Sequence, residues 1–177
     1  KARFALVSLA LIPGCADRQG EERPPSAIRD PLPAYRRWAD GVGQGGRPDG
    51  QAGYRALAEL GYTTVISVDG APPGDGAEGL GLRVVHVPIG YAGIEDDRAL
   101  RIVRAAQLSE GPVYVHCHHG THRGPAAAML IRIALHGLSR AQGSSDLRLS
   151  GCSPNYQGLY ESVESFEPPS AGALAAL

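Results

Sequence analysis

The chain has 177 residues, which is enough for one domain with a buried core. Hydrophobic residues make up 43% and charged residues 20%, a globular rather than a disordered composition. The net charge is −1, so no basic surplus exists to neutralise a nucleic-acid backbone, and we expect no nucleic acid as a partner. Three cysteines are too few for a disulfide scaffold, and no apolar run is long enough for a membrane-spanning helix.

The N-terminus has the pattern of an export signal. Lys1 and Arg3 precede a short apolar stretch over 4–12. Cys15 then follows a small residue, as at the cleavage site of bacterial lipoproteins, where the cysteine is lipidated. We therefore predict a signal peptide over 1–15 in an exported bacterial protein, either periplasmic or held by a lipid on Cys15 at a membrane and facing the periplasm. The alternative is a buried N-terminal strand or helix.

Composition divides the rest of the chain into three parts. Residues 16–33 are polar with four prolines and predict a disordered tether. Residues 34–166 form the predicted domain, which we expect to be monomeric. Residues 167–177 are small and interrupted by proline, and they predict a flexible tail.

Apolar periodicity within the domain alternates between strands and helices. In chain order it predicts a helix over 52–60, strands over 63–68 and 82–89, a helix over 95–108, a strand over 112–116, and helices over 125–135 and 155–166. The helix over 125–135 is apolar on nearly all sides, so it should be central and buried, and Gly137 is expected to end it. This alternation predicts an α/β domain with a mainly parallel central sheet flanked by helices, and a site beyond the carboxyl ends of the strands.

The third predicted strand runs directly into a short loop and then into the buried helix. Cys117 begins this loop, and Arg123 follows six positions later. A loop that closes onto a helix N-terminus points backbone N–H groups inward, which forms an anion site and favours a thiolate. Arg123 can donate two hydrogen bonds to one phosphate group. Gly120 permits the positive φ that such a loop needs.

The loop resembles the signature of the cysteine-based protein tyrosine and dual-specificity phosphatases, which is His-Cys, five residues, Arg. The chain is most similar to small bacterial dual-specificity-like members, and the resemblance also covers 45–60, 66–69 and 85–90. It implies a phosphotyrosine protein phosphatase-like fold. It further implies hydrolysis of phosphate monoesters, on a phosphorylated protein or a small phosphoester, through a phosphocysteine. Thiolate, guanidinium and a proton source suffice for this chemistry, so no cofactor is expected.

The resemblance also assigns roles within the loop. Cys117 is implied to be the nucleophile, Arg123 to bind the phosphoryl oxygens, and His116 to orient the loop. The residues between Cys117 and Arg123 are implied to bind substrate; they are His118, His119, Gly120, Thr121 and His122.

Two positions depart from the family pattern. The residue after the arginine is usually Ser or Thr, whose hydroxyl helps to expel the thiolate, and here it is Gly124. We therefore expect slow hydrolysis of the phosphoenzyme. The family also uses an Asp from a loop before the cysteine as general acid, and that place holds Tyr91 and Ala92. Asp96 is the candidate acid, although a charge that complements the helix dipole is the plainer interpretation of it. Asp69, at the end of the first predicted strand, is a second candidate.

Four other interpretations of the cysteines, histidines and loop are weighed beside this one. Four of the six histidines lie in 116–122, which is typical of a Cys/His metal site, but successive side chains of one loop cannot all reach a single ion, so we expect no metal. Cys152 could pair with Cys117 in a protective disulfide, as in some family members, or could simply be a small buried residue. A cysteine in a strand-loop-helix also occurs in rhodanese-like sulfur-transfer proteins, and a phosphate-binding pseudophosphatase would keep the loop without turnover.

Overall fold

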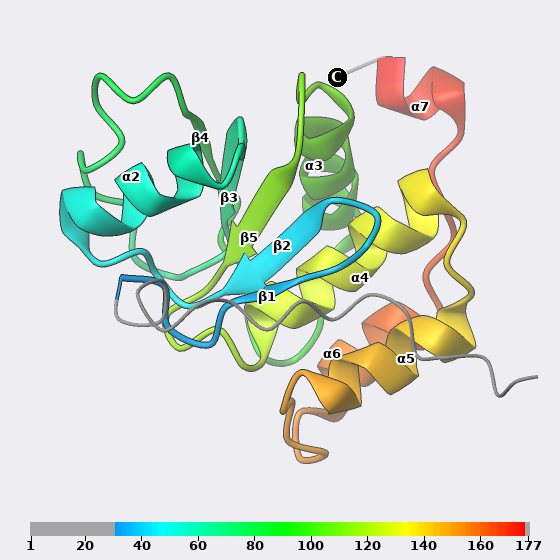
Figure 1. The fold of residues 1–177 in the computed structure, drawn as a ribbon. Helices are drawn as coiled ribbons and strands as arrows, with labels where there is room; N and C mark the ends of the chain where they lie inside the picture. Colours follow the sequence, from blue (N-terminus) through cyan, green and yellow to red (C-terminus); the bar gives the residue numbers. More distant parts are fainter. Residues whose placement is uncertain (1–30, 176–177) are drawn as a thin grey trace, which may run out of the picture.

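The computed structural model describes residues 31–175, and its centre is one five-stranded sheet in the order β1-β2-β5-β3-β4 (Figure 1). The strands are β1 Arg36–Arg37, β2 Val42–Gly45, β3 Thr64–Ser67, β4 Arg83–His86 and β5 Val113–His116. Strands β2, β5, β3 and β4 run parallel, and β1 pairs antiparallel with β2. The predicted mainly parallel α/β sheet is confirmed.

Helices cover both faces of this sheet (Figure 1). They are α2 Gly50–Glu59, α3 Asp96–Gln107, α4 Arg123–His136, α5 Arg140–Leu149, α6 Gln157–Glu164 and α7 Ala171–Ala175. Helix α2 covers one face over a small core that includes Leu57 and Tyr114. Helix α4 contacts β2 and β5 on the other face and is itself covered by α3, α5 and α6. As predicted, α4 is buried through most of its length and ends at Gly137, whose φ is +70°.

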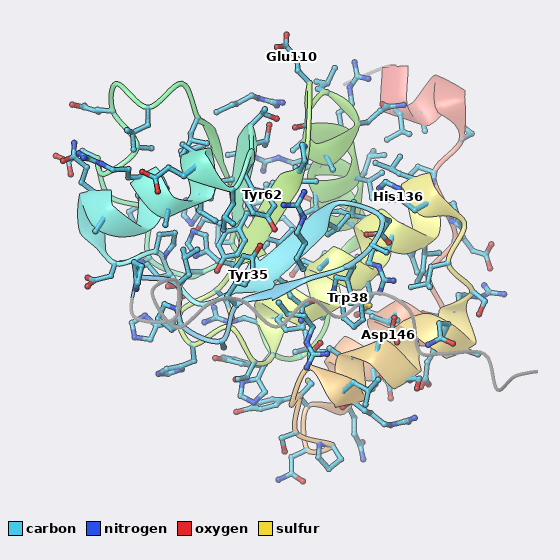
Figure 2. All side chains as sticks on the ribbon, in the orientation of Figure 1. Tyr35, Trp38, Tyr62, Glu110, His136 and Asp146 are labelled. Atoms are coloured by element: carbon cyan, nitrogen blue, oxygen red, sulfur yellow. The ribbon has the colours of Figure 1, made fainter. Side chains whose placement is uncertain are left out.

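Strand β2 was not predicted from the sequence, because half of its residues are glycine. A Cβ on Gly43 would collide with the hydroxyl of Tyr62, and a Cβ on Gly45 would collide with the hydroxyl of Tyr114. Tyr35 stacks on Tyr114 with ring centroids 6.1 Å apart, and its hydroxyl lies 2.9 Å from that of Tyr62 (labelled in Figure 2). The strand is therefore glycine-rich because three tyrosines pack over it.

Helix α5 was also not predicted, since its sequence is polar and contains a glycine. Ser139 caps it by accepting a hydrogen bond at 3.2 Å from the backbone N–H of Gln142. Gly143 then lets α5 approach α4 closely, because a Cβ there would lie 3.1 Å from the side chain of Ile133. The N-terminal cap and the close contact with α4, rather than an apolar stripe in its sequence, therefore explain why this segment forms a helix.

The two ends of the described chain differ from the predicted boundaries. Leu32 is fully buried, so the packed part begins inside the predicted tether. Helix α7 forms within the predicted flexible tail, and Leu174 is buried there. The predicted export signal, Cys15 and most of the tether lie outside the described residues. Within the described part of the chain, no helix is long and apolar enough to cross a membrane.

Arg132 ties α4 to the β1–β2 connection and to α5. Its side chain is 9% exposed, its Nε donates to Asp40 Oδ2 at 2.6 Å, and its Nη1 donates to Asp146 Oδ2 at 2.6 Å. The guanidinium also lies 4.2 Å from the ring centroid of Trp38. Trp38 and Asp146 are labelled at this junction in Figure 2. One buried cation therefore compensates two carboxylates from different segments.

We expect Arg132→Met to lower the free energy of unfolding by about 3–5 kcal/mol, because it leaves two carboxylates without their cation. Arg148→Met is the matched control. Its pair with Glu164 spans 3.9 Å between largely exposed side chains, so its loss should cost less than about 1 kcal/mol. Urea unfolding of both variants measures the difference, and equal losses would contradict this role for Arg132.

Candidate active site

Three parallel strands bring their carboxyl ends to one edge of the sheet. Gly45 at the end of β2 and Ser67 at the end of β3 both pair with His116 at the end of β5. The loop over 117–122, which joins β5 to α4, is therefore flanked by the segments that follow β2 and β3. This is the edge where the sequence predicted the site.

Close packing against β2 fixes the shape of the 117–122 loop. Gly120 has φ +81°, and a Cβ on it would collide with the backbone of Gly45 and Gly46. The backbone N–H of Arg47 donates to the carbonyl of His118 at 3.1 Å. The predicted need for positive φ at Gly120 is confirmed, and the structure adds a steric reason for glycine at the same position.

The loop holds unpartnered hydrogen-bond donors next to a buried thiol. Cys117 is 2% exposed. Within residues 31–175, the backbone amides over 118–123 donate no hydrogen bond to a protein acceptor. The Nε of Arg123 has no acceptor there either, and it is buried. A buried donor normally finds a partner, so Nε together with the free amides is suited to an oxyanion.

Arg123 is held by the segments that follow β3 and β4. Its side chain is 10% exposed, its Nη2 donates to Asp69 Oδ1 at 3.0 Å, and its Nη1 donates to the carbonyl of Ile89 at 3.3 Å. The ring centroid of Tyr91 lies 4.5 Å from the guanidinium carbon. These contacts use one hydrogen on each Nη atom, and the buried Nε has no acceptor among the described residues, so it is free to donate.

Aromatic side chains gather beside Arg123. Tyr91 stacks on Tyr156 with ring centroids 4.8 Å apart, and the His122 ring meets Tyr156 edge-on at 4.5 Å. Burial, together with the charges of His119 and Arg123, lowers the pKa of His122. We call Tyr91, His122 and Tyr156 the aromatic rim. Tyr156 could not be placed here from the sequence. It lies just before α6, and no sequence pattern links that segment to the 117–122 loop.

His116 lies beneath the loop as a neutral side chain. It is fully buried, and its Nδ1 lies 3.3 Å from the carbonyl oxygen of Cys117. Burial lowers its pKa to about 4. A neutral imidazole in contact with the Cys117 backbone is suited to the loop-orienting role that the resemblance implies.

The buried state of His116 predicts a pH dependence of stability. In the unfolded chain the pKa returns to about 6.5, so below that pH the unfolded state binds a proton that the folded state refuses until about pH 4. Stability is therefore lost as pH falls through this window. Between pH 7 and 4.5 the free energy of unfolding should drop about 2 kcal/mol more in the parent than in His116→Gln. Urea unfolding at the two pH values tests this, and identical drops would contradict it.

The other predicted substrate-binding residues line the outside of the loop. His118 and His119 are exposed, with ring centroids 4.6 Å apart. Thr121 Oγ1 lies 3.1 Å from Nδ1 of His122. No group of three or more His, Cys, Asp or Glu side chains in the described part of the chain is arranged to hold a metal ion.

The two candidate carboxylates lie in different places. Asp96 is the first residue of α3. With Phe166 it lines a cavity of about 760 Å³ between α3, α6 and α7. Neither Cys117 nor Arg123 is among the described residues that line this cavity. Asp69, by contrast, contacts Arg123 directly. The structure thus brings the second candidate, and not the first, to the loop.

Arg47 is a functional candidate that sequence analysis missed. Its Nη2 lies 3.6 Å from Asp69 Oδ2 and donates to the carbonyls of Ala71 and Pro72 at 3.1 and 2.9 Å. It directly follows the unpredicted strand β2 and its adjoining Gly46, so no sequence pattern placed it at the site. Recognition of β2 as a strand would have done so.

Cys152 is a free, buried thiol in the same core cluster as Cys117. Burial raises its pKa, the contact with Tyr160 lowers it, and the proximity of Cys117 raises it further. Both cysteines are free thiols in this structure, and the buried position of Cys152 agrees with its interpretation as a small buried residue.

Comparison with known proteins places this geometry in a recognised fold. No family model matches the chain. A stretch of 72 residues is 31% identical to the dual specificity protein phosphatase TpbA of Pseudomonas aeruginosa, and it covers 40% of this chain and 33% of that protein. The chain thus matches about a third of the length of this curated relative.

Solved structures extend the likeness over the whole domain. The crystal structure of P. aeruginosa TpbA has a TM-score of 0.69 at 19% identity and covers 90% of this chain and 97% of its own. The catalytic domain of the PP-IP phosphatase SIW14 from S. cerevisiae, in complex with citrate, has a TM-score of 0.64 at 15% identity and covers 82% and 93%. Human DUSP28 has a TM-score of 0.57 at 21% identity and covers 75% and 93%. The chain has the fold of the small bacterial dual-specificity-like phosphatases.

Proposed function

We propose that this protein is a cysteine-dependent phosphatase that hydrolyses phosphate monoesters through a phosphocysteine on Cys117. The observation that carries the proposal is the set of unpartnered donors, the amides over 118–123 and the Nε of Arg123, in the loop that begins at the buried Cys117. In this mechanism the donors bind the phosphoryl oxygens, where charge develops in the transition state, and Sγ attacks phosphorus.

The contacts of Arg123 support its proposed role as a fixed oxyanion ligand. Asp69 and the Ile89 carbonyl hold the guanidinium through its two Nη atoms, so little reorganisation is needed before Nε donates to a phosphoryl oxygen. Tyr91 packs on the face of the guanidinium and limits its movement.

The aromatic rim favours an aryl phosphate, such as phosphotyrosine, as substrate. Tyr91 is 40% exposed beside Arg123, so its ring can contact an aromatic leaving group. A structural relative, P. aeruginosa TpbA with a TM-score of 0.68, has been solved in complex with pTyr, which supports a phosphorylated substrate here.

A rate assay on 4-nitrophenyl phosphate between pH 5 and 7 tests the proposal. We expect steady turnover that orthovanadate inhibits competitively, because vanadate adopts the geometry of the transition state at the loop. No turnover and no vanadate binding would rule out the proposed function.

Gly124 favours a second candidate function, a phosphate-binding protein with little turnover. A Cβ on Gly124 would lie 3.1 Å from the backbone nitrogen of Cys117, so the start of α4 packs directly on the nucleophile and carries no hydroxyl to assist departure of the thiolate. Rapid-quench kinetics separate the two candidates. Slow second-step hydrolysis predicts a burst of 4-nitrophenol near one per protein and then slow turnover, whereas the binding protein predicts tight phosphate binding and no burst.

A further inference from the structure

The proposed reaction needs a proton donor for the leaving oxygen, and the segment before α3 does not supply one. Residues 88–94 contain no carboxylate, and Glu95 and Asp96 both line a separate cavity. A general acid must come within hydrogen-bond reach of the leaving oxygen, directly or through one water. The donor is therefore to be sought among carboxylates that contact the 117–122 loop itself.

Asp69 is the carboxylate that contacts both ends of this loop. It lies two residues after the end of β3, and its side chain is 7% exposed. Its Oδ1 lies 3.0 Å from Nη2 of Arg123, and its Oδ2 lies 3.6 Å from Nδ1 of His118 and 3.6 Å from Nη2 of Arg47. Because His118 directly follows the thiol and Arg123 begins α4 at the other end of the loop, a carboxylate close to both lies beside the proposed phosphate site.

The two oxygens of Asp69 have different partners. Oδ1 accepts hydrogen bonds from the backbone N–H of Gly70 at 2.8 Å and from Arg123 at 3.0 Å, and these fix the carboxylate. Oδ2 is buried and has no hydrogen-bond partner among the described residues. A buried oxygen that accepts no hydrogen bond is uncommon, and with its charged neighbours Arg47 and His118 both 3.6 Å away it has room for a ligand or a proton. Oδ2 is thus the oxygen that can carry the proton.

We propose that Asp69 is the proton donor of the reaction and replaces the missing carboxylate of the loop before α3. This inference rests on the proposed phosphatase function. In the first step the bond between phosphorus and Cys117 Sγ forms while the ester P–O bond breaks, and the proton on Oδ2 moves to the leaving oxygen. In the second step the Asp69 carboxylate takes a proton from water, whose oxygen attacks phosphorus. The S–P bond then breaks, and inorganic phosphate and the thiolate are released.

Substrate binding supplies the physical reason for a protonated Asp69. The charged and titratable groups that face it are Arg47, His118 and Arg123, with His86 bonded to its backbone carbonyl at 2.8 Å and His116 nearby. A phosphate dianion in the loop counters the same positive charges and repels a second negative charge, so binding favours uptake of a proton on Oδ2.

The dependence of rate on the leaving group distinguishes a proton donor from a residue that only positions Arg123. Phenyl phosphate releases a strongly basic phenolate and needs the proton, whereas 4-nitrophenyl phosphate releases a weakly basic one and hardly needs it. Because a slow second step would make kcat independent of the leaving group, kcat/KM is compared, which reports the first step. For Asp69→Asn, which keeps an oxygen to accept from Arg123, we expect kcat/KM on phenyl phosphate to fall about 10²–10³-fold and kcat/KM on 4-nitrophenyl phosphate to fall much less. Equal losses of kcat/KM on both substrates would mean that Asp69 positions Arg123, and no loss would mean that it does neither; both overturn the proposal.

A rival variant and a binding measurement complete the experiment. Asp96→Asn should leave the ratio of the two kcat/KM values as in the parent, and a selective loss of kcat/KM on phenyl phosphate in that variant would transfer the role to Asp96. Phosphate binding by Asp69→Asn, measured by calorimetry, confirms that the loop is intact. A parent that turns over neither substrate overturns the phosphatase function as well, whereas an active parent with an unselective Asp69→Asn overturns this inference alone.

Discussion

Replacement of Cys117 by Ser is expected to lower kcat on an aryl phosphate by about 10⁴-fold or more, because a hydroxyl is not ionised near neutral pH and the nucleophile is lost. The donors of the loop do not depend on the sulfur, so binding of inorganic phosphate should persist. Steady-state kinetics and calorimetry measure the two effects separately.

Cys152→Ser is the matched control, since Cys152 is the second buried thiol of the described chain. It should keep the kcat of the parent. Comparable activity in Cys117→Ser and the parent, or an equal loss in both serine variants, would remove Cys117 from the mechanism.

Replacement of Arg123 by Lys is expected to lower kcat by about 10²–10³-fold, although the positive charge is retained. A lysine has no planar fork, so it cannot keep the hydrogen bonds to Asp69 and Ile89 while it also offers an Nε donor to the substrate. Phosphate binding should weaken in the same variant.

Arg148→Lys is the control for replacing an arginine by a lysine at a position outside the site. Arg148 lies on the exposed side of α5, and its ion pair with Glu164 is exposed. Its kinetic constants should match those of the parent. An Arg123→Lys protein with parental kcat would show that charge alone is sufficient and would contradict the proposed fixed geometry.

The parts of the fold that could be predicted from sequence are those in which local pattern and tertiary packing agree. A β-branched run bounded by glycines became β3, the predicted strand that leads into the loop became β5, and the apolar stretch after the loop became the buried helix α4. The loop itself was recognisable because its chemistry is concentrated in consecutive residues, from His116 to Arg123.

The parts that could not be predicted depend on contacts between distant residues. Gly43 and Gly45 of β2 are explained by tyrosines far along the chain, and α5 is explained by its close contact with α4. The choice between Asp69 and Asp96 belongs to the same class. Both are plausible acids in the sequence. The pairing of β3 with β5 brings Asp69 into contact with Arg123, and this tertiary contact decides between the two.

Acid quenching during turnover of 4-nitrophenyl phosphate, followed by peptide mass spectrometry, tests the phosphocysteine most directly. Since Gly124 should slow the second step, the intermediate should accumulate, and the peptide that contains Cys117 should carry one phosphoryl group that is absent in Cys117→Ser. Turnover without any phosphorylated peptide, or with the phosphoryl group on a histidine of the loop, would contradict the mechanism.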